Sequence, residues 1–213
     1  MVEITEASLS RLRERLMNRM SFKRFRHTLA VEEMVTRLCT LYCPEETDRL
    51  RAAALLHDIT KELTTEEQAA CCKALGLSCT KEDLLSPKTL HARTAAARIP
   101  AEHCEFAHET VISAVRWHTT GRKDMTLTEK LLYLADYIDE SRSFENCVIL
   151  RRFFWGAHPE EMTAEQRAEL LRDTLILSYD MTIRDLIAEG APIATQTVEA
   201  RNQLLLQRSE QGK

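Results

Sequence analysis

Apolar residues along the chain recur three and four positions apart, the spacing of a helix, in segments separated by short polar turns. No stretch alternates apolar and polar residues for long enough to predict a β-strand. Capping boxes, in which a threonine precedes a glutamate or glutamine by three positions, mark three helix starts: Thr64–Glu67, Thr126–Glu129 and Thr163–Gln166. Glycines fall between the apolar segments at Gly76, Gly121, Gly156 and Gly190. The pattern therefore predicts an all-α fold.

The same pattern gives approximate bounds for the helices. We expect them at about 6–18, 22–42, 45–61, 65–75, 81–85, 90–98, 103–118, 127–140, 147–156, 164–189 and 197–210. The turns between them are short, and no linker rich in proline, glycine or serine divides the chain. There is no internal repeat. We therefore expect one helical bundle, a single domain over residues 1–213.

Charge and hydropathy exclude several classes of function. Lysine and arginine number 29 against 33 aspartate and glutamate, for a net charge of −4, and no basic run occurs. This argues against a general nucleic-acid binder, although a local cationic pocket stays open. No stretch approaches the roughly 20 apolar residues that span a bilayer, and the amphipathic, acidic start does not resemble a signal peptide. We expect a cytoplasmic protein without a membrane segment.

The seven cysteines do not form a recognisable metal motif. Their number is odd, no Cys-x-x-Cys pair occurs, and most lie in apolar helical runs; they are Cys39, Cys43, Cys71, Cys72, Cys79, Cys104 and Cys147. We expect buried free thiols in a reducing compartment.

One short stretch carries unexpected chemistry. His57 and Asp58 directly follow the alanine- and leucine-rich run of residues 51–56, where a buried carboxylate needs a partner. Asp136 poses the same problem inside the apolar segment 131–138. A divalent metal ion would resolve both conflicts, since imidazole nitrogen and carboxylate oxygen are ligands for zinc, iron, manganese and cobalt.

Six candidate ligands lie on five separate predicted helices, with two of them adjacent on one helix: His27, His57, Asp58, His91, His118 and Asp136. A single histidine on an apolar face is usually a hydrogen-bonded core residue, but six such residues together favour a metal site. His103, His108 and His158 lack this context, and we expect them at the surface or at helix caps.

The order of these residues resembles that of the HD-domain phosphohydrolases, all-helical metalloenzymes that cleave phosphate esters and anhydrides. Longer segments resemble the YqeK family over about residues 20–205. They are Arg24-Phe-Arg-His27-Thr, Leu56-His-Asp-Ile-Thr-Lys61, His118-Thr-Thr-Gly-Arg122, Met125, Glu129-Lys-Leu-Leu-Tyr-Leu-Ala-Asp136-Tyr-Ile, Arg142 and Thr197-Val-Glu-Ala-Arg-Asn202. Two segments depart from the family pattern, His91-Ala-Arg-Thr-Ala-Ala and Ile138-Asp139-Glu140. The resemblance implies a symmetrical diadenosine tetraphosphate hydrolase with bound iron.

By the HD pattern, one ion is held by His27, His57, Asp58 and Asp136. His91 and His118 either hold a second ion, with Asp58 bridging, or contact substrate phosphate. Manganese, cobalt or zinc in place of iron stays open. A bound ion lowers the pKa of its water toward neutrality, and attack by hydroxide on the tetraphosphate would release two ADP.

Several residues near the ligands suit a polyphosphate. Lys61 follows Asp58 by three positions, and we expect both to be catalytic residues, with Lys61 stabilising the negative charge that develops on the phosphates. Thr119, Thr120, Gly121 and Arg122 offer hydroxyls, a flexible backbone and a forked cation. The family resemblance adds Arg24 and Arg142. Candidate base-stacking residues are Trp117, Tyr137 and Tyr179.

Other interpretations remain. The fold could carry another HD-type nucleotide phosphohydrolase or phosphodiesterase activity, or a non-catalytic nucleotide-binding module. The simplest alternative is a structural helical bundle in which the histidines have no functional role. The expected partner is a small dinucleoside polyphosphate, and a homodimer is left open.

Overall fold

A computed structural model describes residues 3–211, and no strand occurs in that range. The helices are α1 (Glu6–Met17), α2 (Phe22–Tyr42), α3 (Thr47–Leu56), α4 (Thr65–Ala74), α5 (Lys81–Leu85), α6 (Leu90–Glu102), α7 (Glu109–Trp117), α8 (Leu127–Ile138), α9 (Glu145–Trp155), α10 (Ala164–Ala188) and α11 (Thr195–Gln211). Short 3-10 turns cover Pro44–Glu46, Pro87–Thr89, Cys104–Phe106 and Pro159–Glu161. The all-α prediction is confirmed.

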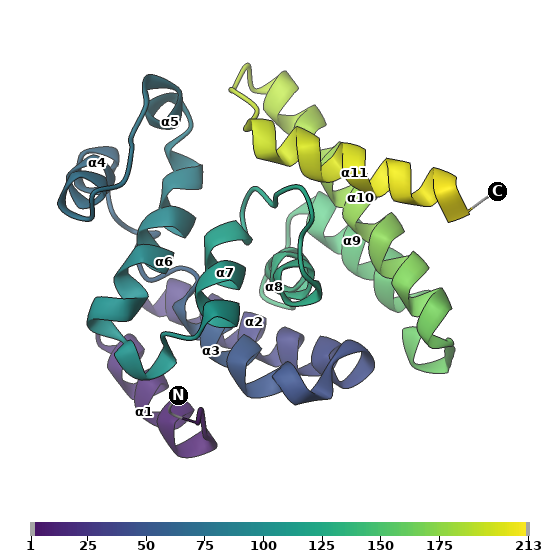
Figure 1. Cartoon of the computed structure of the whole chain (residues 1–213), viewed down its shortest axis with the longest axis horizontal. Coiled ribbons are helices and arrows are strands. Elements are labelled where there is room, and N and C mark those ends of the chain that lie inside the picture. The colour runs from purple at the N-terminus through teal and green to yellow at the C-terminus, as the bar shows by residue number, and fades with distance from the viewer. Residues whose placement is uncertain (1–2, 212–213) are drawn as a thin grey trace.

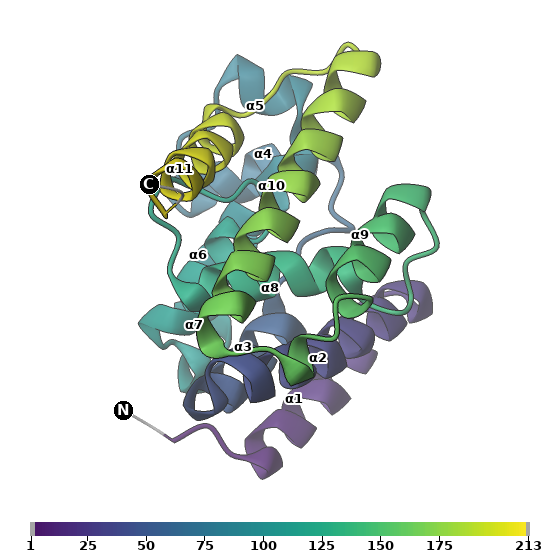
Figure 2. The ribbon, with the colours of Figure 1, turned by 90° about the vertical axis from the view of Figure 1, so that its right-hand side faces the viewer.

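The centre of the fold is α8, which packs against α2, α3, α7 and α9. Figure 1 looks along α8, with α2 and α3 below it, α7 beside it and the α10–α11 pair on the other side. Figure 2 shows the length of α10 running across this core. The rings of Tyr133 on α8 and Tyr179 on α10 pack with their centroids 4.9 Å apart, and both side chains are fully buried. This contact fixes α10 to the central bundle.

The predicted helix starts are confirmed, because all three capping boxes form with both of their hydrogen bonds. The glutamate of the capping box at α8 has a second partner in the preceding loop. Glu129 is fully buried, accepts from the Thr126 amide at 2.9 Å and forms an ion pair with Arg122 at 3.0 Å. The carboxylate thereby joins the start of α8 to the loop that precedes it.

Gly121 ends the segment after α7 with a φ of +63°, a conformation that suits glycine. A Cβ at this position would lie 2.0 Å from the hydroxyl oxygen of Tyr179. Any side chain here would therefore both strain the turn and displace the α8–α10 contact.

Two predicted helices are shorter than expected. The helix expected over 45–61 ends at Leu56, and residues 57–62 form successive turns. The helix expected over 103–118 begins only at Glu109, where the His108 side chain accepts from the Thr110 amide at 3.2 Å and caps the start. In both cases a histidine stands at the end of the helix, His57 after α3 and His108 before α7. The spacing of apolar residues does not reveal such an end.

The remaining histidines and the cysteines are placed as follows. As predicted, His108 caps the start of α7, His103 is the cap residue at the end of α6, where it is buried, and His158 is exposed. All seven cysteines are free thiols, and five of them are buried, whereas Cys79 is half-buried and Cys104 is exposed. Among the described residues, no helix is both long and apolar enough to cross a membrane.

Candidate metal centre

The six predicted ligands meet in the middle of the bundle, and all six are buried. His27 comes from α2, His57 and Asp58 from the turn after α3, His91 from α6, His118 from the position after α7, and Asp136 from α8. The regular α3 helix ends before His57, and the turns that follow it place both His57 and Asp58 in the cluster.

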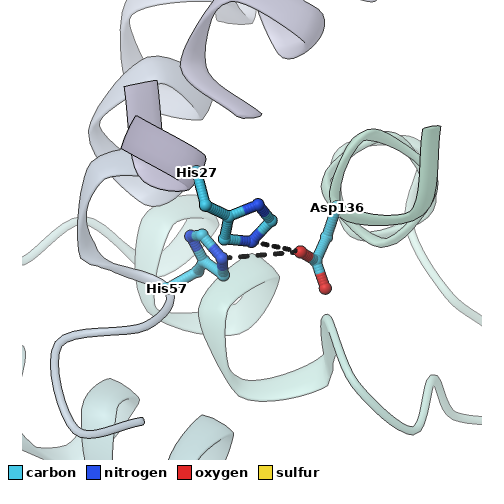
Figure 3. Close-up of side chains that lie close together, drawn as sticks. All are labelled: His27, His57 and Asp136. Atoms are coloured by element: carbon cyan, nitrogen blue, oxygen red, sulfur yellow. Dashed lines mark ion pairs between the residues drawn. The ribbon is translucent and has the colours of Figure 1, made fainter. Parts of the chain in front are cut away.

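We call the first group of ligands the His27–His57–Asp136 group. Figure 3 shows the two imidazoles pointing at the Asp136 carboxylate. The Nε2 atoms of His27 and His57 lie 2.9 Å and 3.7 Å from Asp136 Oδ1. Neither Nε2 makes a hydrogen bond of good geometry, although both are buried. Two unsatisfied imidazole nitrogens converging on a carboxylate oxygen fit a divalent metal ion, which binds histidine nitrogen at about 2.0–2.1 Å.

The Nδ1 atoms of His57 and His118 each lie within hydrogen-bond distance of a backbone carbonyl. His57 Nδ1 lies 2.6 Å from the Ala54 carbonyl oxygen, and His118 Nδ1 lies 2.7 Å from that of Val115. Since a carbonyl only accepts, each Nδ1 carries the proton and each Nε2 is turned to the centre of the cluster. Backbone geometry thus selects the nitrogen that can bind a metal.

The Nδ1 atom of His27, on the other side of the ring from Nε2, lies near two side chains. Its Nδ1 lies 3.2 Å from Ser141 Oγ and 3.4 Å from Asp139 Oδ2. Asp139 is fully buried, and its Oδ2 makes no hydrogen bond of good geometry. A carboxylate behind a ligating histidine orients the ring and raises its basicity.

The second group consists of His91 and His118, with Lys61 and Thr119 beside them. The two Nε2 atoms lie 3.0 Å apart, and Thr119 Oγ1 lies 3.2 Å from each. Lys61 Nζ lies 3.2 Å from His91 Nδ1. We call these four residues the His91–His118 group.

Asp58 stands between the two groups and uses one oxygen for each. Its Oδ2 lies 3.4 Å from His57 Nε2, and its Oδ1 lies 3.2 Å from His91 Nε2. The same oxygen is 3.8 Å from His118 Nε2. The geometry is therefore that of a carboxylate shared by two adjoining sites.

The two groups shift histidine pKa values in opposite directions. Burial lowers the pKa of His57, but the Asp58 and Asp136 carboxylates outweigh it and raise that pKa to about 10. Burial lowers the pKa of His91 to about 4, with the Lys61 cation adding to the effect. At neutral pH a proton and a metal ion therefore compete for His57, whereas His91 is already neutral.

The carboxylates and the lysine respond to the same surroundings. Burial alone would raise the pKa of Asp136, but Arg142 and the two histidines of its group hold it well below the usual range. The pKa of Asp58 is likewise held well below its usual range, against burial, chiefly by His57. Burial lowers the pKa of Lys61, partly offset by Asp58. Both carboxylates are therefore ionised and available as ligands.

Two arginines close the open side of the cluster. Arg24 pairs with Asp58 Oδ2, and Arg142 lies 2.5 Å from Asp136 Oδ1. Both guanidinium groups keep about a quarter of their side-chain surface exposed. The turn at Asp139, where the sequence departs from the family pattern, still brings Arg142 to Asp136, since the Ser141 amide donates to Asp139 Oδ1 at 2.8 Å.

The predicted phosphate-binding run after His118 is only partly at the cluster. Within the described residues, Thr119 alone of this run contacts the ligands. Thr120 donates to the Gly121 carbonyl at 2.9 Å, and its own carbonyl accepts from Thr197 at 3.0 Å. Arg122 is held by Glu129 and lies over the Trp117 ring. A direct substrate role for Thr120, Gly121 and Arg122 stays a prediction.

The three aromatic candidates for base stacking differ in burial and in packing partners. Tyr179 is fully buried, and its hydroxyl lies 3.2 Å from Met125 Sδ, so it offers no ring face to a ligand. Tyr137 packs on Tyr133 with centroids 5.1 Å apart. Trp117 is half-buried beneath Arg116 and Arg122.

One feature of the site was not apparent from the sequence. Asp139 stood out only as part of a departure from the family pattern, although it follows Asp136 by three positions and could have been suspected as its neighbour.

The helical fold and its buried cluster of histidine and aspartate define the class of protein. The chain matches the family described as HD domain over residues 24–141, more than half of its length, and it therefore belongs to the HD-domain family. This confirms the wider resemblance drawn from the sequence.

Particular relatives narrow the class further. A symmetrical bis(5′-nucleosyl)-tetraphosphatase from Halalkalibacterium halodurans is 30% identical over 186 residues, which cover 86% of this chain and 90% of the relative. A protein of the same name from Staphylococcus aureus is 37% identical over 57% of this chain and 61% of its own. These relatives confirm the resemblance to the YqeK family.

A solved structure agrees with the fold over nearly the whole chain. It is the crystal structure of a Clostridium acetobutylicum protein described as a predicted HD superfamily hydrolase involved in NAD metabolism. It has a TM-score of 0.80 and 32% identity, and covers 93% of this chain and 97% of its own.

Proposed function

We propose that this protein hydrolyses diadenosine tetraphosphate symmetrically to two ADP with the help of a bound divalent metal ion, iron in the first instance. The observation that carries the proposal is the His27–His57–Asp136 group with Asp58, whose unsatisfied nitrogens and ionised oxygens converge beside three cations, Lys61, Arg24 and Arg142. The names of the relatives support the choice of substrate.

His27, His57, Asp58 and Asp136 would hold the ion. When bound, a divalent ion supplies a Lewis acid for a phosphoryl oxygen and lowers the pKa of a coordinated water. Iron and manganese tolerate a ligand set with two carboxylates better than softer metals do. The donor set therefore favours iron or manganese.

The remaining groups act on the phosphate chain. In symmetrical hydrolysis the oxygen of water forms a bond to one of the two inner phosphorus atoms, and the bond from that atom to the central bridging oxygen breaks. The bridging oxygen leaves with the second ADP. Lys61, Arg24 and Arg142 are placed to neutralise charge on the phosphates as it builds up.

His91 and His118 contact substrate phosphate in this proposal and do not hold a second tightly bound ion. The Lys61 ammonium group, 3.2 Å from His91, disfavours another cation at that place. Thr119 adds a hydroxyl donor between the two rings. One tightly bound ion per chain is thus expected.

The proposal is tested by chromatography of the products formed from diadenosine tetraphosphate by anaerobically prepared protein, with and without ferrous ion. ADP as the sole product, lost on chelation, supports it. AMP with ATP would mean asymmetric cleavage. If the metal-loaded protein does not turn over this substrate, nucleoside mono- and triphosphates, cyclic nucleotides and NAD are the next compounds to try.

A variant pair makes the test specific to the site. Asp58→Ala removes the carboxylate shared by both groups and should abolish both metal content and turnover. His158→Ala, at an exposed histidine away from the cluster, is the matched control and should change neither. An Asp58→Ala protein with wild-type activity would contradict the mechanism.

Three wider expectations belong to the same proposal. They are a single functional domain over residues 1–213, a cytoplasmic location, and a small-molecule substrate in place of nucleic acid. A homodimer stays open and is decided by light scattering of the purified protein.

A further inference from the structure

A cavity of about 430 Å³ opens beside the metal ligand His27. Two segments line it: residues 22–27 at the start of α2, and residues 141–144 before α9. Its volume lies within the usual range for sites that bind small molecules. The cavity is continuous with the His27–His57–Asp136 group through His27 itself.

The lining of this cavity is strongly cationic. It includes Lys23, Arg24, Arg26 and Arg142, and no acidic residue occurs among the described residues that line it. Such a wall attracts phosphate groups and guides them towards the ligand cluster. Arg24 and Arg142 already contact Asp58 and Asp136, so a phosphate chain bound here would reach the ligands directly.

The same cavity carries two exposed phenylalanines, one from each lining segment. Phe22 is 76% exposed and Phe144 is 71% exposed, the highest fractions among the large apolar side chains that the structure describes. Phe144 also occupies the cap position of α9, where it makes no capping hydrogen bond. Serine, threonine, aspartate and asparagine stabilise that position, so a phenylalanine there costs helix stability.

We propose that this cavity binds one of the two nucleoside ends of the substrate, with the base stacked on Phe22 and Phe144 and the phosphates lying along the arginines towards the metal ligands. Exposed aromatic faces next to cations are the recurring way in which proteins bind bases and nucleotides. The inference rests on the proposed function for the identity of the nucleotide, and it assigns a base-binding site that the buried Tyr179 cannot provide.

A tryptophan reporter tests the stacking at the site itself. In Phe144→Trp, AMP should quench the added fluorescence saturably, while ribose 5-phosphate, which lacks only the base, should not. Phe153→Trp, on the surface of the same helix but outside the cavity, is the matched control and should stay unquenched. Equal effects of AMP on the two reporters would overturn the inference, as would equal effects of AMP and ribose 5-phosphate on the first.

Kinetics provide the second measurement. Phe22→Ala and Phe144→Ala should each raise KM for diadenosine tetraphosphate about five- to tenfold, in the range of a lost base–aromatic stack, and leave kcat within about twofold. Phe153→Ala should change neither. An unchanged KM in both cavity variants would contradict the inference.

The two proposals fail in different ways. If the metal-loaded wild-type protein releases no ADP from the dinucleotide, the proposed function is wrong, and the reporter experiment with AMP still decides the base site. If ADP is released, but AMP affects the two reporters equally and KM is unchanged in both cavity variants, only the base site is wrong. Because both phenylalanines are exposed, their variants should fold like the wild type, which thermal unfolding checks.

Discussion

The His27–His57–Asp136 group and the His91–His118 group contain the same kind of ring but differ in what surrounds it. In the first, two carboxylates raise the pKa of His57 to about 10 and the inward nitrogens lack good hydrogen bonds. In the second, a lysine stands beside the rings, burial lowers the pKa of His91 to about 4, and the nitrogens contact each other and a threonine.

Since His57 and His91 are both buried, the net charge around each histidine decides which ligand it suits. A group with excess negative charge attracts a cation, whereas neutral histidines beside an ammonium group suit an anion such as phosphate. Asp58 contributes one carboxylate oxygen to each group. Four substitutions test this difference between the two groups.

The largest effect is expected from Asp136→Ala. It removes the carboxylate on which His27 and His57 converge, so metal content should fall to near zero. Turnover should drop by about a thousandfold or more, the equivalent of losing several kcal/mol of metal catalysis. Metal analysis of the purified variant and kcat/KM check this, with thermal unfolding as a test of the fold. A variant that keeps its metal would remove Asp136 from the ligand set.

His91→Ala should lower kcat/KM by about a hundredfold while the protein keeps one metal ion per chain. The physical reason is that a phosphate contact is lost and the cation site is not. Titration with ferrous ion under anaerobic conditions gives the stoichiometry. Loss of the tightly bound ion would place His91 in the metal site and erase the distinction between the two groups.

Lys61→Met keeps the length of the side chain but removes its charge. We expect kcat to fall about 10- to 100-fold, because charge building up on the phosphates loses a cation. Affinity for the metal ion should hold or increase, since a positive charge near Asp58 is gone. Weaker metal binding in this variant would contradict the electrostatic difference between the groups.

The smallest effect is expected from Asp139→Asn, which acts through the ring of His27. The amide can still contact Nδ1 but loses the negative charge, so the Kd for the metal should rise about tenfold. At saturating metal, kcat should stay near that of the wild type. Asp173→Asn, at a half-exposed carboxylate of α10 outside the cluster, is the control. An unchanged Kd would mean that Asp139 only shapes the turn.

Much of this architecture follows from local sequence. Three capping boxes located helix starts, because such a start depends on residues three positions apart. The buried carboxylates at Asp58 and Asp136 indicated a shared cation, because an unpaired charge in an apolar segment is costly wherever the segment lies.

Features that depend on distant contacts were not predictable in the same way. Arg122 resembles a phosphate ligand in the sequence, yet it pairs with the buried Glu129. Tyr179 resembles a base platform, yet packing with Tyr133 buries it. Asp139 gains its place behind His27 only when α2 and α8 pack together. Apolar spacing tells which face of a helix is buried, but not which neighbour covers it.

The proposed ligands come from separate elements of the bundle, so metal binding would be coupled to folding. His27 and Asp136 are about 110 positions apart in the sequence, and an ion bound between them would tie the start of the bundle to its centre as a cross-link does. Since an unfolded chain rarely presents a preformed site, each tenfold rise in free metal above Kd would add about 1.4 kcal/mol to the free energy of unfolding. The folded fraction of the protein would thus follow the metal supply of the cell.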